Sequence, residues 1–103
     1  MDRVRAEYVE QVLSCVEAVP PGRVTTYGTI AAHVGGGPRQ VGWVMSHHGG
    51  PVPWWRVVRA DGSPPPCHEG TADGHYAEEG TPRNGHGRVR MREAFWDPAV
   101  PEE

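Results

Sequence analysis

The sequence predicts a mainly helical domain with a small β wing, similar to a winged helix-turn-helix. Two helical patterns follow each other across the glycine turn Gly35–Gly37, and Pro38 suits the first turn of the second helix. An apolar run that ends in the turn signal Asp61–Gly62 comes next, where a wing would lie. At 103 residues the chain is expected to form one domain over 1–103.

The first element is expected to be an amphipathic helix from Asp2 to Val19, ended by Pro20. Its apolar side chains recur at helical spacing, and they are Val9, Val12, Leu13 and Val16. Cys15 lies near this apolar stripe, so we expect it to be a buried, unreactive thiol.

Local signals bound the next two helices. Thr26 is expected to cap a helix that begins at Tyr27 and ends at the three glycines. The following helix is predicted from Pro38 to His48, and at about 100° per residue its side chains separate into two faces. The face expected in the core holds Val41, Val44, Met45 and His48, and the other face holds Arg39, Gly42, Trp43 and Ser46. The second face therefore offers a cation, a gap in the side-chain layer and a flat aromatic ring.

The run from Val52 to Ala60 is predicted to be a strand. Alternation in a strand would put Trp54 and Trp55 on opposite faces of the sheet. One ring is therefore expected in the core, and the other is expected to be exposed or to line a pocket.

Residues 63–103 are expected to be loop-rich. A short helix is predicted between Thr71 and Gly80, and a strand or helix between Arg88 and Trp96 would close the core. The tail from Pro98 to Glu103 is expected to be frayed.

Charge is distributed unevenly along the chain, whose formal net charge is −3. The segment from Pro20 to Ala60 contains four arginines, Arg23, Arg39, Arg56 and Arg59, and no acid. The rest of the chain has six arginines and 13 acids. A local cationic surface on an acidic protein favours a binding site for a polyanion.

Other features exclude several classes of protein. No apolar run approaches the roughly 20 residues that span a bilayer, and no signal peptide is visible, so we expect a cytoplasmic protein without a membrane partner. Cys15 and Cys67 do not make a disulfide framework. Six histidines invite a metal site, but Cys67, His68 and His75 match none of the common zinc spacings. We predict no metal and no cofactor.

The sequence contains three motifs in a fixed order: Pro21-Gly22-x-Val24-x-Thr26-Tyr27-Gly28-x-Ile30-Ala31, then Pro38-Arg39-x-Val41-Gly42, then Pro53-Trp54-Trp55-Arg56-Val57-Val58. Together they resemble the DNA-binding domain of the O6-alkylguanine-DNA alkyltransferases, over about residues 5–62. The resemblance implies the winged helix-turn-helix-like fold of the C-terminal domain of those enzymes.

The third motif departs from that of active members, which have Pro-Cys-His-Arg-Val-Val with the Cys as alkyl acceptor. Here Trp54 replaces the Cys and Trp55 replaces the His, so the chain resembles the alkyltransferase-like proteins, whose usual motif is Trp-His-Arg. Indole offers no thiolate to attack an alkyl carbon. The resemblance therefore implies a binding protein that is not an enzyme.

The resemblance also implies roles for single residues. Tyr27 would press on the phosphate beside the target nucleotide, and Arg39 would enter the base stack through the minor groove. Gly42 would allow close backbone approach, and the flipped guanine would lie against Trp54, near the backbone carbonyls of Trp54 and Val57. The expected DNA contacts are Tyr27, Arg39, Gly42, Trp43 and Ser46. The expected lesion pocket consists of Tyr27, Trp54, Trp55, Val57 and Cys67. Arg56 is expected to bind neighbouring carbonyls or acids rather than DNA.

A second Pro-Cys-His sequence begins at Pro66. Cys67 follows Arg39 by 28 residues, whereas Trp54 follows it by 15, close to the spacing of active relatives. Glu69 stands where the motif would have its Arg, and a carboxylate there would raise the pKa of the thiol. We therefore expect Cys67 to help line the pocket rather than to accept an alkyl group.

These inferences favour a monomeric, non-enzymatic sensor of O6-alkylguanine in duplex DNA that flags the lesion for nucleotide excision repair proteins. Two alternatives stay open. The chain would be an active alkyltransferase if Cys67 were the acceptor, or a winged helix-turn-helix regulator if it preferred an undamaged sequence.

Overall fold

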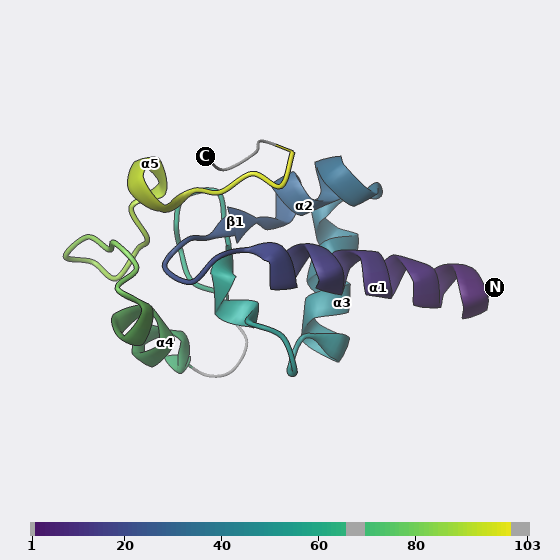
Figure 1. Cartoon of the computed structure of the whole chain (residues 1–103), viewed down its shortest axis with the longest axis horizontal. Coiled ribbons are helices and arrows are strands. Elements are labelled where there is room, and N and C mark those ends of the chain that lie inside the picture. Colours follow the sequence, from purple (N-terminus) through teal and green to yellow (C-terminus); the bar gives the residue numbers. More distant parts are fainter. Residues whose placement is uncertain (1, 66–69, 100–103) are drawn as a thin grey trace.

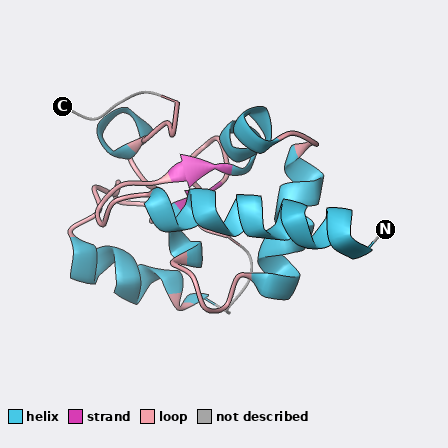
Figure 2. Ribbon diagram, turned by 45° about the vertical axis from the view of Figure 1, so that its right-hand side comes forward, coloured by secondary structure: helices cyan, strands magenta, loops and turns pink. Residues whose placement is uncertain are grey.

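The computed structural model describes residues 2–65 and 70–99. Along the chain lie α1 (Asp2–Ala18), β1 (Thr25–Thr26), α2 (Tyr27–Val34), α3 (Pro38–His48), the 3-10 helix η1 (Trp54–Arg56), β2 (Val57–Val58), α4 (Ala72–Glu79) and α5 (Met91–Ala94). The structure confirms the predicted fold class, a small, mainly helical domain with a minimal sheet (Figure 1). Figure 2 shows how the helices surround that sheet.

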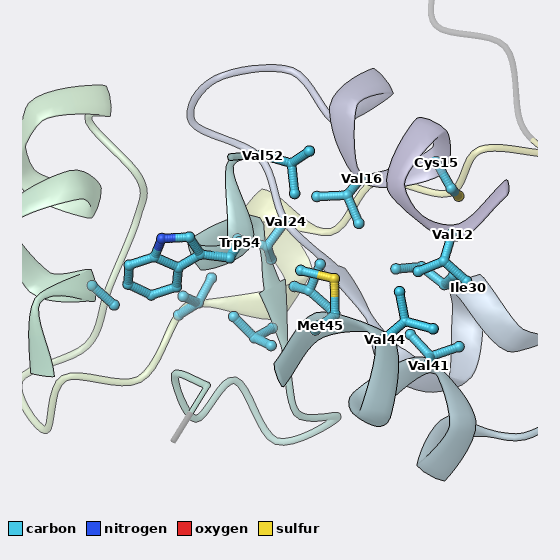
Figure 3. Packing of buried hydrophobic residues seen from close by; sticks show 14 of the residues in the cluster. Val12, Cys15, Val16, Val24, Ile30, Val41, Val44, Met45, Val52 and Trp54 are labelled. Carbon is cyan, nitrogen blue, oxygen red and sulfur yellow. The ribbon is translucent and has the colours of Figure 1, made fainter. Parts of the chain in front are cut away.

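The core lies where α1, α2 and α3 pack against one another and against β2. Val12 and Val16 of α1 are fully buried, and Cys15 is buried beside them, as the helical spacing predicts. Ile30 of α2 is fully buried in the same cluster, and Val44 of α3 is almost fully buried there (Figure 3). These faces are apolar at a period of 3.6 residues, so burying them holds the helices together.

Local signals set the bounds of α2 and α3 as predicted. The Thr26 hydroxyl oxygen accepts a hydrogen bond from the Thr29 backbone N–H at 3.0 Å, so Thr26 caps α2. Gly35 follows the helix with a φ of 100°, a conformation that favours glycine. Helix α3 spans Pro38–His48 with the proline in its first turn.

The predicted strand from Val52 to Ala60 does not form as a whole. Trp54–Arg56 is a 3-10 turn, and only Val57–Val58 is extended. Pro53 has no N–H to give to a ladder, and the Trp54 N–H already donates to the Val52 carbonyl oxygen at 2.7 Å. The alternation expected for Trp54 and Trp55 is therefore wrong, because neither residue belongs to a strand.

The wing is reduced to a two-residue pairing between distant segments. Strand β2 runs parallel to β1, with Thr25 opposite Val57 and Thr26 opposite Val58. This pairing brings the start of α2 beside the segment that follows η1, so it connects the first and third sequence motifs in space.

The second half of the chain closes the core through α4 and the C-terminal segment. Helix α4 falls within the predicted range Thr71–Gly80, and Tyr76 is fully buried. Beyond α5, the Trp96 N–H donates to the Val24 carbonyl oxygen at 2.7 Å. Residues 66–69 and 100–103 lie outside the described residues. Within the described ranges, no helix combines the length and apolarity needed to cross a membrane.

Candidate nucleic-acid interface

Helix α3 presents the two faces that its sequence predicts, with one exception. Val41, Val44 and Met45 are buried, whereas Arg39, Trp43 and Ser46 are exposed. His48 was placed on the buried face but is exposed, because it is the last residue of α3 and lies beyond the core residues of the helix.

A hollow of about 430 Å³ lies between α2, α3 and the segment after β2. It is lined by Tyr27, Pro38, Arg39, Gly42, Met45, Ser46 and Arg59. Four of the five expected DNA contacts therefore meet at one place. Arg59 adds a second guanidinium to the hollow. The three motifs gave Arg59 no role, but it belongs to the acid-free, arginine-containing segment from Pro20 to Ala60. No carboxylate occurs among the described residues that line the hollow.

Gly42 leaves a gap in this surface that the fold does not require. Apart from its chain neighbours and the backbone of its own helix, a Cβ atom built at Gly42 would meet no protein atom within 4 Å. The Ser46 hydroxyl donates back to the Gly42 carbonyl oxygen at 2.9 Å, which keeps that side chain close to the helix. Packing inside the protein therefore does not require a glycine at position 42, and the missing side chain leaves room for a molecule outside the protein.

Trp43 lies away from the hollow. Its ring stacks on His47, with centroids 4.4 Å apart, and the Arg5 guanidinium lies 5.0 Å from its centroid. The ring therefore extends the surface of α3 toward α1, although sequence reasoning grouped it with Arg39 and Gly42.

Three of the expected lesion-pocket residues, Trp54, Trp55 and Val57, form a second group apart from the hollow. The Trp54 side chain is 6% exposed and belongs to the core, Trp55 is half-buried, and Val57 is fully buried. None of these three side chains lines the hollow; among the expected pocket residues that the structure describes, only Tyr27 does. Cys67, the fifth expected pocket residue, lies outside the described residues.

Sequence reasoning considered His75 only as a possible metal ligand and missed its contacts with both tryptophans. The His75 ring is stacked on Trp55 with centroids 3.7 Å apart and an angle of 6° between the planes. It also meets Trp54 at 5.5 Å and 83°. His75 and Glu79 are four residues apart in a predicted helix and so share one face, but this spacing does not indicate what the face packs against.

Arg56 binds protein groups, as predicted. Its Nε donates to Glu79 Oε1 at 3.1 Å, its Nη2 pairs with the other carboxylate oxygen, and its Nη1 donates to the Val19 carbonyl oxygen at 2.9 Å. Burial favours a higher pKa for Glu79, but hydrogen bonds from Arg56 and from the Gly22 N–H outweigh it, so the pKa is lowered. Glu79 is therefore held as a carboxylate that fastens α4 to η1.

The remaining candidate groups do not form a reactive centre in the part of the chain that the structure describes. Burial, with a smaller contribution from Asp97, raises the pKa of the Cys15 thiol and disfavours the nucleophilic thiolate. No three potential metal ligands cluster within the described ranges.

The sequence and the structure were compared with known proteins. The family model described as 6-O-methylguanine DNA methyltransferase, DNA binding domain, matches residues 7–78. The chain is 43% identical over 64 residues to alkyltransferase-like protein 1 of Schizosaccharomyces pombe, covering 55% of this chain and 56% of the relative. It is 39% identical over 59 residues to the methylated-DNA–protein-cysteine methyltransferase of Methanothermobacter thermautotrophicus, covering 55% and 34%. The chain thus spans about a third of the length of the transferase and a little over half of the length of the alkyltransferase-like relative.

Solved structures resemble most of the chain. The S. pombe Atl1 complex with damaged DNA containing O6-carboxymethylguanine superimposes with a TM-score of 0.73 at 31% identity, covering 90% of this chain and 97% of that chain. A second S. pombe ATL complex with DNA gives a TM-score of 0.76 at the same 31% identity. The similar proteins therefore include a transferase as well as alkyltransferase-like proteins.

Proposed function

We propose a function from one premise: the chain belongs to the family of the 6-O-methylguanine DNA methyltransferase DNA-binding domain. We propose that it binds O6-alkylguanine in duplex DNA without transferring the alkyl group. In this proposal the protein flips the damaged base out of the helix and flags it for nucleotide excision repair.

The observation that carries the proposal is the hollow in which Tyr27, Arg39 and Gly42 meet. Its arginines, Arg39 and Arg59, face no lining carboxylate among the described residues, so they are available to phosphates and bases. Tyr27 is the first residue of α2, where the helix dipole adds positive potential next to a phosphate. Gly42 gives the backbone of α3 room to approach a groove wall.

The proposed recognition step is base flipping. Extruding a base costs a few kcal/mol, and the cost is smallest for a damaged base whose pairing is weakened. Arg39 would occupy the vacated place in the stack, while the guanine would lie against Trp54. Aromatic stacking of this kind contributes roughly 1–3 kcal/mol. Because Trp54 is 6% exposed, its surroundings must move to admit the base.

The residues at the acceptor position support a function without alkyl transfer. Trp54 stands where active relatives have the nucleophilic Cys, and indole cannot provide a thiolate. Cys15 is buried at 7% exposure, and its raised pKa keeps it as the neutral thiol. Cys67 is the remaining sulfur nucleophile in the sequence, so it is the residue that a test of enzymatic activity must address.

A fluorescence titration tests the proposal directly. Two short duplexes, identical except for one O6-methylguanine, would be titrated into the protein at near-physiological salt, because salt strongly affects DNA affinity. We expect tighter binding to the damaged duplex, with quenching of tryptophan emission. Equal affinity for the two duplexes would contradict the proposal, and preference for one undamaged sequence would support a transcription regulator instead.

Intact-mass measurement separates binding from catalysis. After incubation with the damaged duplex, we expect the mass of the protein to stay unchanged. A mass gain equal to one alkyl group, abolished in Cys67→Ala but kept in Cys15→Ala, would identify an active alkyltransferase.

A further inference from the structure

Three aromatic rings from two elements form a compact cluster at the acceptor position. Trp54 and Trp55 come from η1, and His75 comes from α4. His75 and Trp55 stack in parallel with centroids 3.7 Å apart, and Trp55 meets Trp54 edge-on at 5.5 Å and 88°. In Figure 3, the Trp54 ring points away from the labelled valines and toward green ribbon, the colour that the segment containing α4 has in Figure 1.

The distances show how this cluster supports Trp54. Its ring centroid lies 5.5 Å from the His75 centroid and 5.5 Å from the Trp55 centroid. A point equally distant from two parallel rings lies on the plane midway between them. Both stacked rings therefore lie beside Trp54 at equal centroid distances, and the plane of Trp54 is nearly perpendicular to each of them. Edge-to-face contacts of this kind are favourable for aromatic pairs.

The stack is itself held in place by α4. The Tyr76 hydroxyl donates to the Trp55 carbonyl oxygen at 2.6 Å, and the Arg56 guanidinium lies 5.5 Å from the centroid of the Trp55 ring. Glu79 in turn binds Arg56. This support matters because η1 is a single 3-10 turn, whose hydrogen-bond geometry is weaker than that of an α-helix. Contacts from α4 therefore help to hold the residues of η1 in one conformation.

We infer that His75 is a positioning residue that fixes the orientation of Trp54 through its stack with Trp55. The inference rests on the proposed function, since it concerns how Trp54 receives the flipped base. Because Trp54 is 6% exposed, the base can reach it only when its surroundings move, and the stack would keep the ring in one orientation during that movement. Alkyltransferase-like relatives usually have a His where this chain has Trp55. In this chain the ring of Trp55 has a stacking partner in His75.

The test compares three variants with the wild-type chain. His75→Ala removes the stack, and His75→Phe keeps an aromatic ring there. His86→Ala is the matched control, because His86 lies on an exposed turn outside the cluster. Each protein would be titrated with the undamaged duplex and with the O6-methylguanine duplex. Far-UV circular dichroism and thermal melting would establish that each variant is folded.

We expect His75→Ala to bind the damaged duplex roughly three- to tenfold more weakly, while binding of the undamaged duplex changes by less than about twofold. His75→Phe should retain most of the discrimination, and His86→Ala all of it. The near-UV circular dichroism of the free protein, which reports the coupled tryptophans, should change in His75→Ala and persist in His75→Phe. A role in stability alone would not change the ratio of the two affinities.

The outcomes separate the inference from the proposed function. A wild-type chain without lesion preference would overturn the proposed function, and the inference with it. A wild-type preference that His75→Ala keeps in full would overturn the inference alone. An unchanged near-UV spectrum in His75→Ala would also overturn it, because His75 would then not orient the tryptophans.

Discussion

Arg56 and Glu79 fasten the turn that carries Trp54 to helix α4. The two side chains lie 23 residues apart in sequence and are each only 13% exposed. Arg56 Nε is 3.1 Å from Glu79 Oε1, and a second guanidinium nitrogen pairs with the other carboxylate oxygen. A forked pair of this kind fixes geometry as well as charge, so the position of Trp54 depends on a helix in the second half of the chain.

Replacing Glu79 with Gln should lower the free energy of unfolding by about 2 kcal/mol at neutral pH, because Arg56 would lose a charged, largely buried partner. The pKa of Glu79 is lowered in the folded chain, so its contribution is present above the ordinary glutamate pKa of about 4.3 and is lost as pH falls through the folded-state pKa. The stability difference between wild type and Glu79→Gln should therefore shrink as the pH falls below about 4. Urea denaturation at several pH values measures it, and a difference independent of pH would contradict this assignment.

Replacing Arg39 with Ala should weaken binding of the damaged duplex by about 1–3 kcal/mol, as expected for an arginine inserted among bases. The fold should be unaffected, since Arg39 is exposed. Arg92→Ala is the matched control, because Arg92 is an exposed arginine of α5 outside the hollow. An unchanged dissociation constant for Arg39→Ala, or an equal loss in Arg92→Ala, would remove Arg39 from the site.

Replacing Gly42 with Ala should change stability and DNA binding in opposite directions. Outside its chain neighbours and its own helix backbone, the new Cβ would meet no protein atom within 4 Å. Alanine inside a helix is favoured over glycine by roughly 0.5–1 kcal/mol, so the protein should become more stable. The same methyl group would keep the groove wall at a distance and lower the affinity for both duplexes. Thermal melting and fluorescence titration measure the two effects. If affinity is retained in the stabilised variant, close approach at Gly42 is not needed.

Replacing Trp54 with Cys should restore little alkyl transfer. Trp54 is 6% exposed, and in the proposed function Trp55 stands where the resemblance puts the His that accompanies the thiol in active members. Burial would also raise the pKa of the new thiol and reduce its nucleophilic fraction. Intact-mass measurement after incubation with the damaged duplex reports transfer. Rapid uptake of one alkyl group by this variant would show that neither burial nor Trp55 prevents the reaction.

Local signals in the sequence determined the first three helices. Thr26, the three glycines from Gly35 and Pro38 act over a few residues, so the ends of α2 and α3 could be predicted without knowing the rest of the fold. The period of 3.6 residues likewise separated the buried Val41 from the exposed Arg39. The order of the motifs was enough to predict the family, because it does not depend on how the second half folds.

Only the tertiary structure decided the conformation and surroundings of the two tryptophans. Alternation favoured a strand, but Pro53 cannot donate to a ladder, and the docking of α4 places His75 against Trp55 and Glu79 against Arg56. Those partners lie about 20 residues further along the chain, beyond the reach of any periodic pattern. The sequence therefore determined which face of α3 is cationic and open. Packing between distant segments decided how Trp54 is buried and which aromatic rings lie against it.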